Sequence, residues 1–379
     1  MQPLPKHLPA LDGLRGVAIL LVVLTHCSGG WQAALSLTQN TRLWAPTFDL
    51  PRWLGVVSGE AVHGVTLFFV VSAFTLTRSL AQGADLRRYV IRRVARVAPG
   101  YWLAGIAYTL AAGLVPRLWA PDGVAPSDLV VAAVFGSAWQ GGASMAVVPG
   151  GWSVSCEVAF YAALPLLLWV IQGRLWRAAA LTVTASVAVQ IAARHGIVAH
   201  TWSYVPQYIN PMVQAPVFLC GITAALLVRH SHLPYLPYCP YVLLALAIFA
   251  VPFNPVGEWY LQHHLAFAVL AAAAVALAAT RPPRLLGSAV MRRVGEVSYS
   301  MYLVHFALLS PSLWLAERLV PADHWQTLAL HLLLTSSTSF VAATVLHRWV
   351  EVPGIALGRA LIRRLPSQKS PELVYRPTL

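Results

Sequence analysis

Long apolar runs separated by short polar stretches dominate the chain. An apolar run of about 20 residues is long enough to cross a lipid bilayer as a helix. The pattern predicts ten such spans, at residues 11–30, 61–81, 95–115, 152–172, 176–193, 211–229, 238–253, 260–280, 297–318 and 326–347. We therefore expect an all-α integral membrane protein, with a multi-spanning domain over residues 1–350 and a basic cytosolic tail over residues 351–379.

The composition agrees with this pattern, because 58% of the residues are hydrophobic and only 10% are charged. Soluble domains carry about 25% charged residues. The formal net charge of +13 would suit a nucleic-acid partner, but the arginines gather in loops between spans, as topology signals do. We therefore expect no nucleic-acid partner. The cysteines are scattered without C-x-x-C spacing and predict buried thiols rather than disulfides or a metal site: Cys27, Cys156, Cys220 and Cys239.

Lysine and arginine are distributed unequally between the two sides of the predicted spans. With the N-terminus inside, one side receives Lys6, Arg87, Arg88, Arg92, Arg93, Arg96, Arg174, Arg177, Arg229, Arg281, Arg284, Arg292, Arg293, Arg348, Arg359, Arg363, Arg364, Lys369 and Arg376. The other side receives Arg42, Arg52, Arg117, Arg194 and Arg318. Basic residues concentrate on the cytosolic side, so we expect both termini in the cytosol and the protein in the inner membrane of a bacterium. The long external loop over residues 116–151 contains an apolar piece at 129–139, which is too short to span and predicts a re-entrant or interfacial helix.

The first predicted span carries an arginine near its start and a histidine near its end. Arg15 and His26 are eleven residues apart, which is about three helical turns or roughly 16 Å, so both emerge from one face. Ionisable groups inside a membrane need partners and are functional by default. The alternative is that both are satisfied structural groups.

Four further stretches carry polar groups within apolar runs. In the second span, Ser72 follows Thr66 in residues 64–74, a pattern that also occurs where helices simply pack. Arg93 and Arg96 share a helix face at the start of the third span, as a phosphate clamp requires, although they would also serve as topology signals. Glu157 lies inside the apolar run of the fourth span, where a structural ion pair is the alternative.

The ninth span begins with a polar stripe. Ser298, Tyr302 and His305 are spaced four and three residues apart, so they lie on one helix face. A polar stripe on a membrane helix faces other helices or a cavity.

Five motifs in this order resemble the membrane-bound acyltransferase-3 family: L-D-G-L-R-G-x9-H, G-V-T-L-F-F-V-V-S-A-F, R-R-V-A-R-V-A-P-G-Y-W, W-S-V-S-C-E-x3-Y and S-Y-S-M-Y-L-V-H. The resemblance extends from residue 11 to the Glu351-Val352-Pro353 ending. It implies O-acylation of a glycan, lipid-linked sugar or macrolide-like acceptor. The implied co-substrate is acyl-CoA, most simply acetyl-CoA, with no permanently bound cofactor and no metal.

The resemblance also implies roles for individual residues. His26 matches the catalytic histidine and Arg15 its motif partner, while Arg93 and Arg96 match the arginine pair associated with the acyl-CoA donor. Glu157 or His305 would orient His26 or relay its proton. We assign Ser72, which matches a further motif position, to the donor site.

Three positions depart from the family's pattern. Thr66 stands where an aspartate is common, Ala73 where a glycine is usual, and Val158 where a second glutamate follows the first. These changes leave the reaction class in place but alter the expected surroundings of the histidine, and with them the acceptor.

Two other function classes fit some of these residues. A proton-coupled secondary transporter would use His26, Glu157 and His305 as a proton relay, but the sequence has no evident internal repeat and the arginine pair has no role there. A non-catalytic membrane scaffold is the third reading, which consumption of a thioester by the purified protein would exclude.

The arginine asymmetry generates a topology prediction. Reporter domains fused after Ser127 and after Gln368 should lie on opposite sides of the membrane, because five predicted spans separate an external loop from the cytosolic tail. Protease accessibility or reporter activity would locate each fusion. If both reporters were found on the same side, the number of spans between them would be wrong by an odd number.

Overall fold

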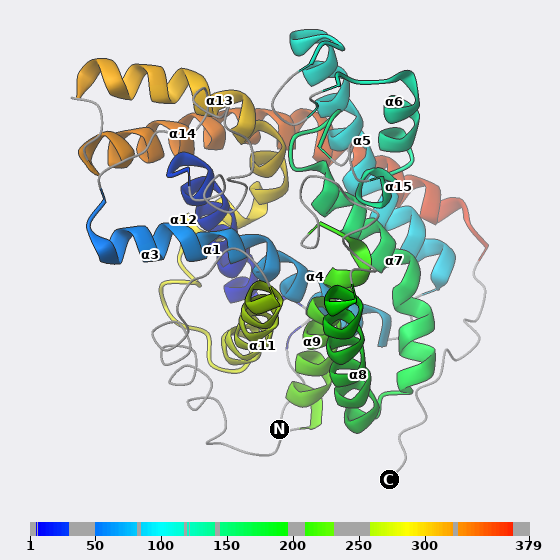
Figure 1. Ribbon diagram of the computed structural model, residues 1–379. Helices are drawn as coiled ribbons and strands as arrows, with labels where there is room; N and C mark the ends of the chain where they lie inside the picture. Colours follow the sequence, from blue (N-terminus) through cyan, green and yellow to red (C-terminus); the bar gives the residue numbers. More distant parts are fainter. Residues whose placement is uncertain are drawn as a thin grey trace.

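The computed structural model (Figure 1) describes residues 5, 7–29, 50–81, 85–116, 120, 122–140, 145–195, 209–230, 258–320 and 325–366. The secondary structure in these residues is helical, and they contain no β-strand. This confirms the all-α class that the apolar pattern predicts.

The helices follow one another with short connections. They are α1 (Pro9–Cys27), α3 (Arg52–Glu60), η1 (Ala61–His63), α4 (Gly64–Ala81), α5 (Leu86–Ala112), α6 (Pro126–Ala133), η2 (Ser137–Trp139), α7 (Gly151–Ile171), α8 (Leu175–Arg194), α9 (Pro211–His230), α11 (Glu258–Thr280), α12 (Ala289–Glu296), α13 (Ser298–Leu319), α14 (Trp325–Leu346), η4 (His347–Glu351) and α15 (Val352–Arg364). A helix covers each predicted span except 238–253, which lies outside the described residues.

Six helical segments among the described residues are long and apolar enough to cross a membrane. They are Pro9–Cys27, Trp53–Leu80, Gly151–Ile171, Leu175–Ala192, Pro211–His230 and Trp325–Arg364. The membrane character of the chain follows from them. The full number of ten spans and the cytosolic position of both termini stay predictions.

Helix α1 lies at the centre of the bundle, where it packs against α4, α12, α13 and α14 (Figure 1). Its buried residues are distributed around the whole helix rather than along one stripe. A helix that is apolar all round is one that other helices enclose. The sequence of α1 therefore places it in the core, and the side chains that it carries face other helices.

Glycines allow the neighbours of α1 to approach its backbone. A Cβ atom on Gly295 of α12 would lie 1.8 Å from the Asp12 carbonyl oxygen, and one on Gly64 would lie 2.6 Å from that of Ala18. Membrane helices associate through such small residues, because close backbone approach maximises packing where no hydrophobic effect operates. These contacts fix α1 against both α12 and α4.

Helices on the periphery present apolar side chains outward. Val183, Val187 and Ile191 of α8 are exposed, as are Leu333 and Val341 of α14. A soluble protein rarely exposes continuous apolar surface of this kind. These faces fit contact with lipid chains.

Two smaller expectations also concern described residues. The external loop contains the short helices α6 and η2 in place of a span, which confirms a helix there. Cys27, Cys156 and Cys220 are free and buried, as predicted. Cys239 lies outside the described residues.

The glycine contacts generate a stability prediction. Gly295→Ala should destabilise the folded protein by about 1–3 kcal/mol, because the new methyl group overlaps the α1 backbone and forces the two helices apart. The melting temperature of the detergent-solubilised protein would measure the loss. Gly55→Ala on α3 is the matched control, since a Cβ there meets nothing within 4 Å and alanine favours a helix over glycine. An unchanged melting temperature for Gly295→Ala would contradict the packing described here.

Candidate active site

Arg15, near the start of α1, is held by polar side chains from its own helix and from α4. Asp12 lies one turn before it, close to the helix start at Pro9. Arg15 Nη1 donates to Asp12 Oδ1 over 2.9 Å, and Nη2 donates to Thr75 Oγ1 over 3.3 Å. Asp12 also contacts His7 Nε2 at 2.7 Å. The charge of Arg15 is thus compensated within the protein, as apolar surroundings require.

A second polar contact joins α4 to α7, three residues before Thr75. Ser72 Oγ donates to Glu157 Oε1 over 2.5 Å. Tyr161, one turn further along α7, makes a side-chain hydrogen bond to Glu157, and Arg15 lies within electrostatic range of the same carboxylate. Because Ser72 and Thr75 share one face of α4, the helix presents one hydroxyl to a carboxylate and the other to a guanidinium.

The two arginines of the third predicted span reach this region from α5. The Arg93 guanidinium lies 5.9 Å from the centre of the Tyr161 ring, and its Nε is buried without a hydrogen-bond partner among the described residues. Arg96 Nη2 lies 3.6 Å from Glu351 Oε1, and Arg96 is also within electrostatic range of Arg15. We name Arg15, Arg93 and Arg96 the arginine cluster.

His26, near the other end of α1, lies beside α13. Its ring centre is 5.1 Å from that of His305, and 4.5 Å from that of Phe306 in an edge-on arrangement. His26 Nδ1 donates to the Val22 carbonyl oxygen over 2.6 Å. Because a carbonyl only accepts hydrogen bonds, the proton of the neutral ring lies on Nδ1, and Nε2 carries the basic lone pair.

His305 has the same tautomer as His26. It is fully buried, at 0% exposure, and its Nδ1 donates to the Tyr302 carbonyl oxygen over 2.7 Å. Its Nε2 is buried without a hydrogen-bond partner in the described part of the chain. Buried polar atoms are nearly always satisfied in folded proteins, so this nitrogen is suited to a group that arrives with a substrate. We name His26 and His305 the histidine pair.

The first turn of α7 is fixed against α13 next to the histidine pair. Tyr302 Oη donates to the Gly150 carbonyl oxygen over 2.9 Å and accepts from Ser153 Oγ over 2.8 Å. Gly150 has φ +75°, and a Cβ atom on it would lie 2.7 Å from Tyr302 Oη and 3.1 Å from Phe306. Only glycine fits this position, so the sequence fixes where α7 begins.

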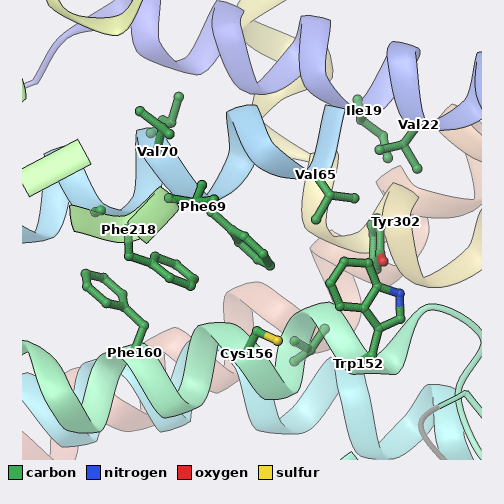
Figure 2. Close-up of a cluster of buried hydrophobic side chains, with 14 of the residues drawn as sticks. Ile19, Val22, Val65, Phe69, Val70, Trp152, Cys156, Phe160, Phe218 and Tyr302 are labelled. Carbon is green, nitrogen blue, oxygen red and sulfur yellow. The ribbon is translucent and has the colours of Figure 1, made fainter. Parts of the chain in front are cut away.

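An apolar layer separates the arginine cluster from the histidine pair (Figure 2). On α1, Ile19 and Val22 lie between Arg15 and His26, and they face Trp152 and Phe69 in the cluster that Figure 2 shows. These side chains are buried. The two polar groups therefore occupy different levels of the bundle, about 16 Å apart along α1.

The structure separates residues that the sequence left as alternatives. His305 lies next to His26, whereas the side-chain contacts of Glu157 are with Ser72 and Tyr161 near the arginine cluster. Sequence reasoning missed four residues of the site: Asp12, Thr75, Tyr161 and Glu351. Asp12 and Tyr161 fall within the motifs quoted above, which was the available signal.

A further buried polar group was also missed. His63 stacks on Phe267 with ring centres 3.9 Å apart, and its Nε2 lies 3.6 Å from Glu60 Oε2. On the other side, His264 contacts Gln214 Oε1 at 3.1 Å and Thr66 Oγ1 at 3.4 Å. The two histidine rings are stacked, with their centres 6.0 Å apart. We name Glu60, His63, Thr66, Gln214 and His264 the second polar cluster.

Comparison with known proteins decides the class of this site. A family profile described as an acyltransferase domain matches residues 8–348, which include the arginine cluster and the histidine pair. The chain belongs to the acyltransferase-3 family. Acyltransferase MdmB of Streptomyces mycarofaciens is 29% identical, over 98% of this chain and 97% of the relative. No solved structure matches the chain. The protein is therefore an acyltransferase, and the resemblance of its motifs is confirmed.

Proposed function

We propose that this acyltransferase moves an acyl group, most simply acetyl, from acyl-CoA to a hydroxyl group of a glycan, a lipid-linked sugar or a macrolide-like acceptor. The supporting observation is that one central helix carries a member of the arginine cluster at one end and a member of the histidine pair at the other. The first group suits the phosphates of a donor. The second suits proton transfer at the reacting atoms.

The donor's phosphates would bind at the arginine cluster. Guanidinium groups match phosphate oxygens in geometry as well as charge, and Arg93 Nε has no acceptor among the described residues. Ser72 belongs to this site through Glu157, which it holds beside Arg15. The pantetheine arm would then run along α1, through the apolar layer, and bring the thioester to His26.

The reaction itself would take place at the histidine pair. The acceptor oxygen attacks the thioester carbonyl carbon while His26 Nε2 takes the hydroxyl proton. The C–S bond then breaks, the new ester is released, and the thiolate of CoA recovers the proton from His26. The lone pair of His305 Nε2 would stabilise the protonated His26 by accepting a hydrogen bond or sharing its proton, as the third group of a triad does.

Family membership favours this enzyme over a proton-coupled transporter built from the same residues. The contacts support the same choice, because Glu157 bonds to Ser72 and Tyr161 rather than extending a relay from His26. We further propose that the protein resides in the inner membrane of a bacterium, with the arginine cluster toward the cytosol, where acyl-CoA is made.

The first test concerns His26. Purified protein receives labelled acetyl-CoA with candidate glycans and macrolides, and mass spectrometry identifies the product. His26→Ala should lower turnover by about 10²–10⁴, the range for a lost general base, while acetyl-CoA still binds. His230→Ala, at an exposed position on α9, controls for loss of a histidine. A well-folded His26→Ala protein with near-normal turnover would exclude the mechanism.

The second test concerns the donor site. Arg93→Ala and Arg96→Ala should each raise the KM for acetyl-CoA, since each removes a charge-assisted phosphate contact of about 1.5–3 kcal/mol. Turnover at saturating donor should change much less. Arg92→Ala is the matched control, because Arg92 lies on the same helix with its side chain exposed. If KM were unchanged in both variants, these arginines would serve topology alone.

A further inference from the structure

Glu351 is a buried carboxylate that the mechanism above does not use. It ends the π-helical turn η4, between α14 and α15, and only 1% of its surface is exposed. A π-helical turn is rare and occurs frequently at functional sites, because it re-aims side chains that a regular helix would place elsewhere. The residue also lies just beyond the part of the chain that the family profile matches.

The two oxygens of Glu351 have different surroundings. Ser300 Oγ donates to Oε2 over 3.0 Å, and His347 Nδ1 donates to the same oxygen over 2.9 Å. Oε1 has no hydrogen-bond partner among the described residues, and it faces Arg96 Nη2 at 3.6 Å. One oxygen is therefore anchored by the protein, and the other is directed at a member of the arginine cluster.

The distance to Arg96 decides what this contact does. A charge-assisted hydrogen bond is about 2.7–2.9 Å long, so at 3.6 Å the attraction acts without occupying an N–H group of Arg96. The Arg96 side chain is 37% exposed, whereas that of Glu351 is 1% exposed. The carboxylate thus lies behind the guanidinium, and the guanidinium keeps its donors for a ligand on the accessible side.

Close helix packing keeps the two side chains in register. Behind Glu351, a Cβ atom on Gly354 would lie 2.8 Å from the Ala95 carbonyl oxygen, so α15 touches the α5 backbone beside Arg96. Tyr299 Oη donates to the Val97 carbonyl oxygen over 2.7 Å, which ties α13 to the same turn of α5. Arg96 therefore stands on a turn that both neighbouring helices hold in place.

We propose that Glu351 is a positioning residue that orients the Arg96 guanidinium toward a phosphate of the acyl-CoA donor. The proposal rests on the donor site proposed above. Glu351 does not touch the donor, and its effect passes through Arg96. Loss of its charge would leave Arg96 free to turn away from the phosphate.

Glu351→Gln tests this directly, because it keeps the size of the side chain and removes the charge. The KM for acetyl-CoA should rise on the order of tenfold, the effect of one charge-assisted contact, while kcat changes by less than about twofold. S-acetyl-N-acetylcysteamine, a thioester without phosphates, should be used as well as by the unaltered protein. Glu296→Gln is the matched control, since Glu296 pairs with Arg293 at 3.0 Å but is 43% exposed.

Two results would overturn the proposal. Equal loss with both thioesters would mean that Glu351 only supports the fold. A lower KM for acetyl-CoA would mean that its negative charge repels the donor's phosphates rather than orienting their partner. If Glu351→Gln does not fold, Ser300→Ala, which removes one anchor from Oε2, should raise the KM for acetyl-CoA alone, and no rise would refute the proposal.

The double variant separates this proposal from the donor site on which it rests. In an Arg96→Ala background, Glu351→Gln should have no further effect on KM, because residues that act through one another are not additive. An added rise would refute the positioning role. If Arg96→Ala by itself left KM unchanged, the proposed donor site would fail. If only Glu351→Gln had no effect, the donor site would stand and Glu351 would have no part in it.

Discussion

The ion pair between Arg15 and Asp12 allows the central helix to carry a permanent charge into apolar surroundings. Hydrocarbon does not solvate ions, so a guanidinium in a helix bundle is stable only where protein groups replace water. Asp12 supplies the countercharge from the same helix, and Thr75 supplies an acceptor from α4. The close approach of α4 at Gly64 and of α12 at Gly295 then fixes α1 in the one place where these partners meet. The position of every other site residue on α1 follows from this.

The apolar layer gives the two ends of α1 different chemistry. At one end, arginines and carboxylates balance one another and suit an anionic ligand. At the other end, two neutral imidazoles lie against Phe306. In a water-excluded site, electrostatic interactions are stronger than in water and competing hydrolysis is suppressed. An acyl transferase benefits from both effects, because its thioester must react with the acceptor hydroxyl and not with water.

The sequence predicted the helices and the faces of the site, but not the contacts between helices. Arg15 and His26 share a face of α1 because helical geometry requires it. Glu157 and His305 were equal candidates as partners of His26, since periodicity shows which face is polar and not which helix lies opposite. Glu351 was harder to find still, because its contacts depend on a π-helical turn that no pattern of apolar residues encodes.

Thr66 shows how one departure from a family's pattern changes a buried site. Its hydroxyl contacts His264 Nδ1 at 3.4 Å, and Gln214 contacts the other nitrogen of the same ring at 3.1 Å. An aspartate in place of Thr66 would put a negative charge against a fully buried imidazole, and burying that charge is costly unless the imidazole becomes protonated to pair with it. Threonine and glutamine are neutral, so they satisfy the ring without requiring it to be charged. Because Gly64 brings this part of α4 against the turn of α1 that ends at Val22, whose carbonyl holds His26, the neutral form of the second polar cluster belongs to the surroundings of the histidine pair.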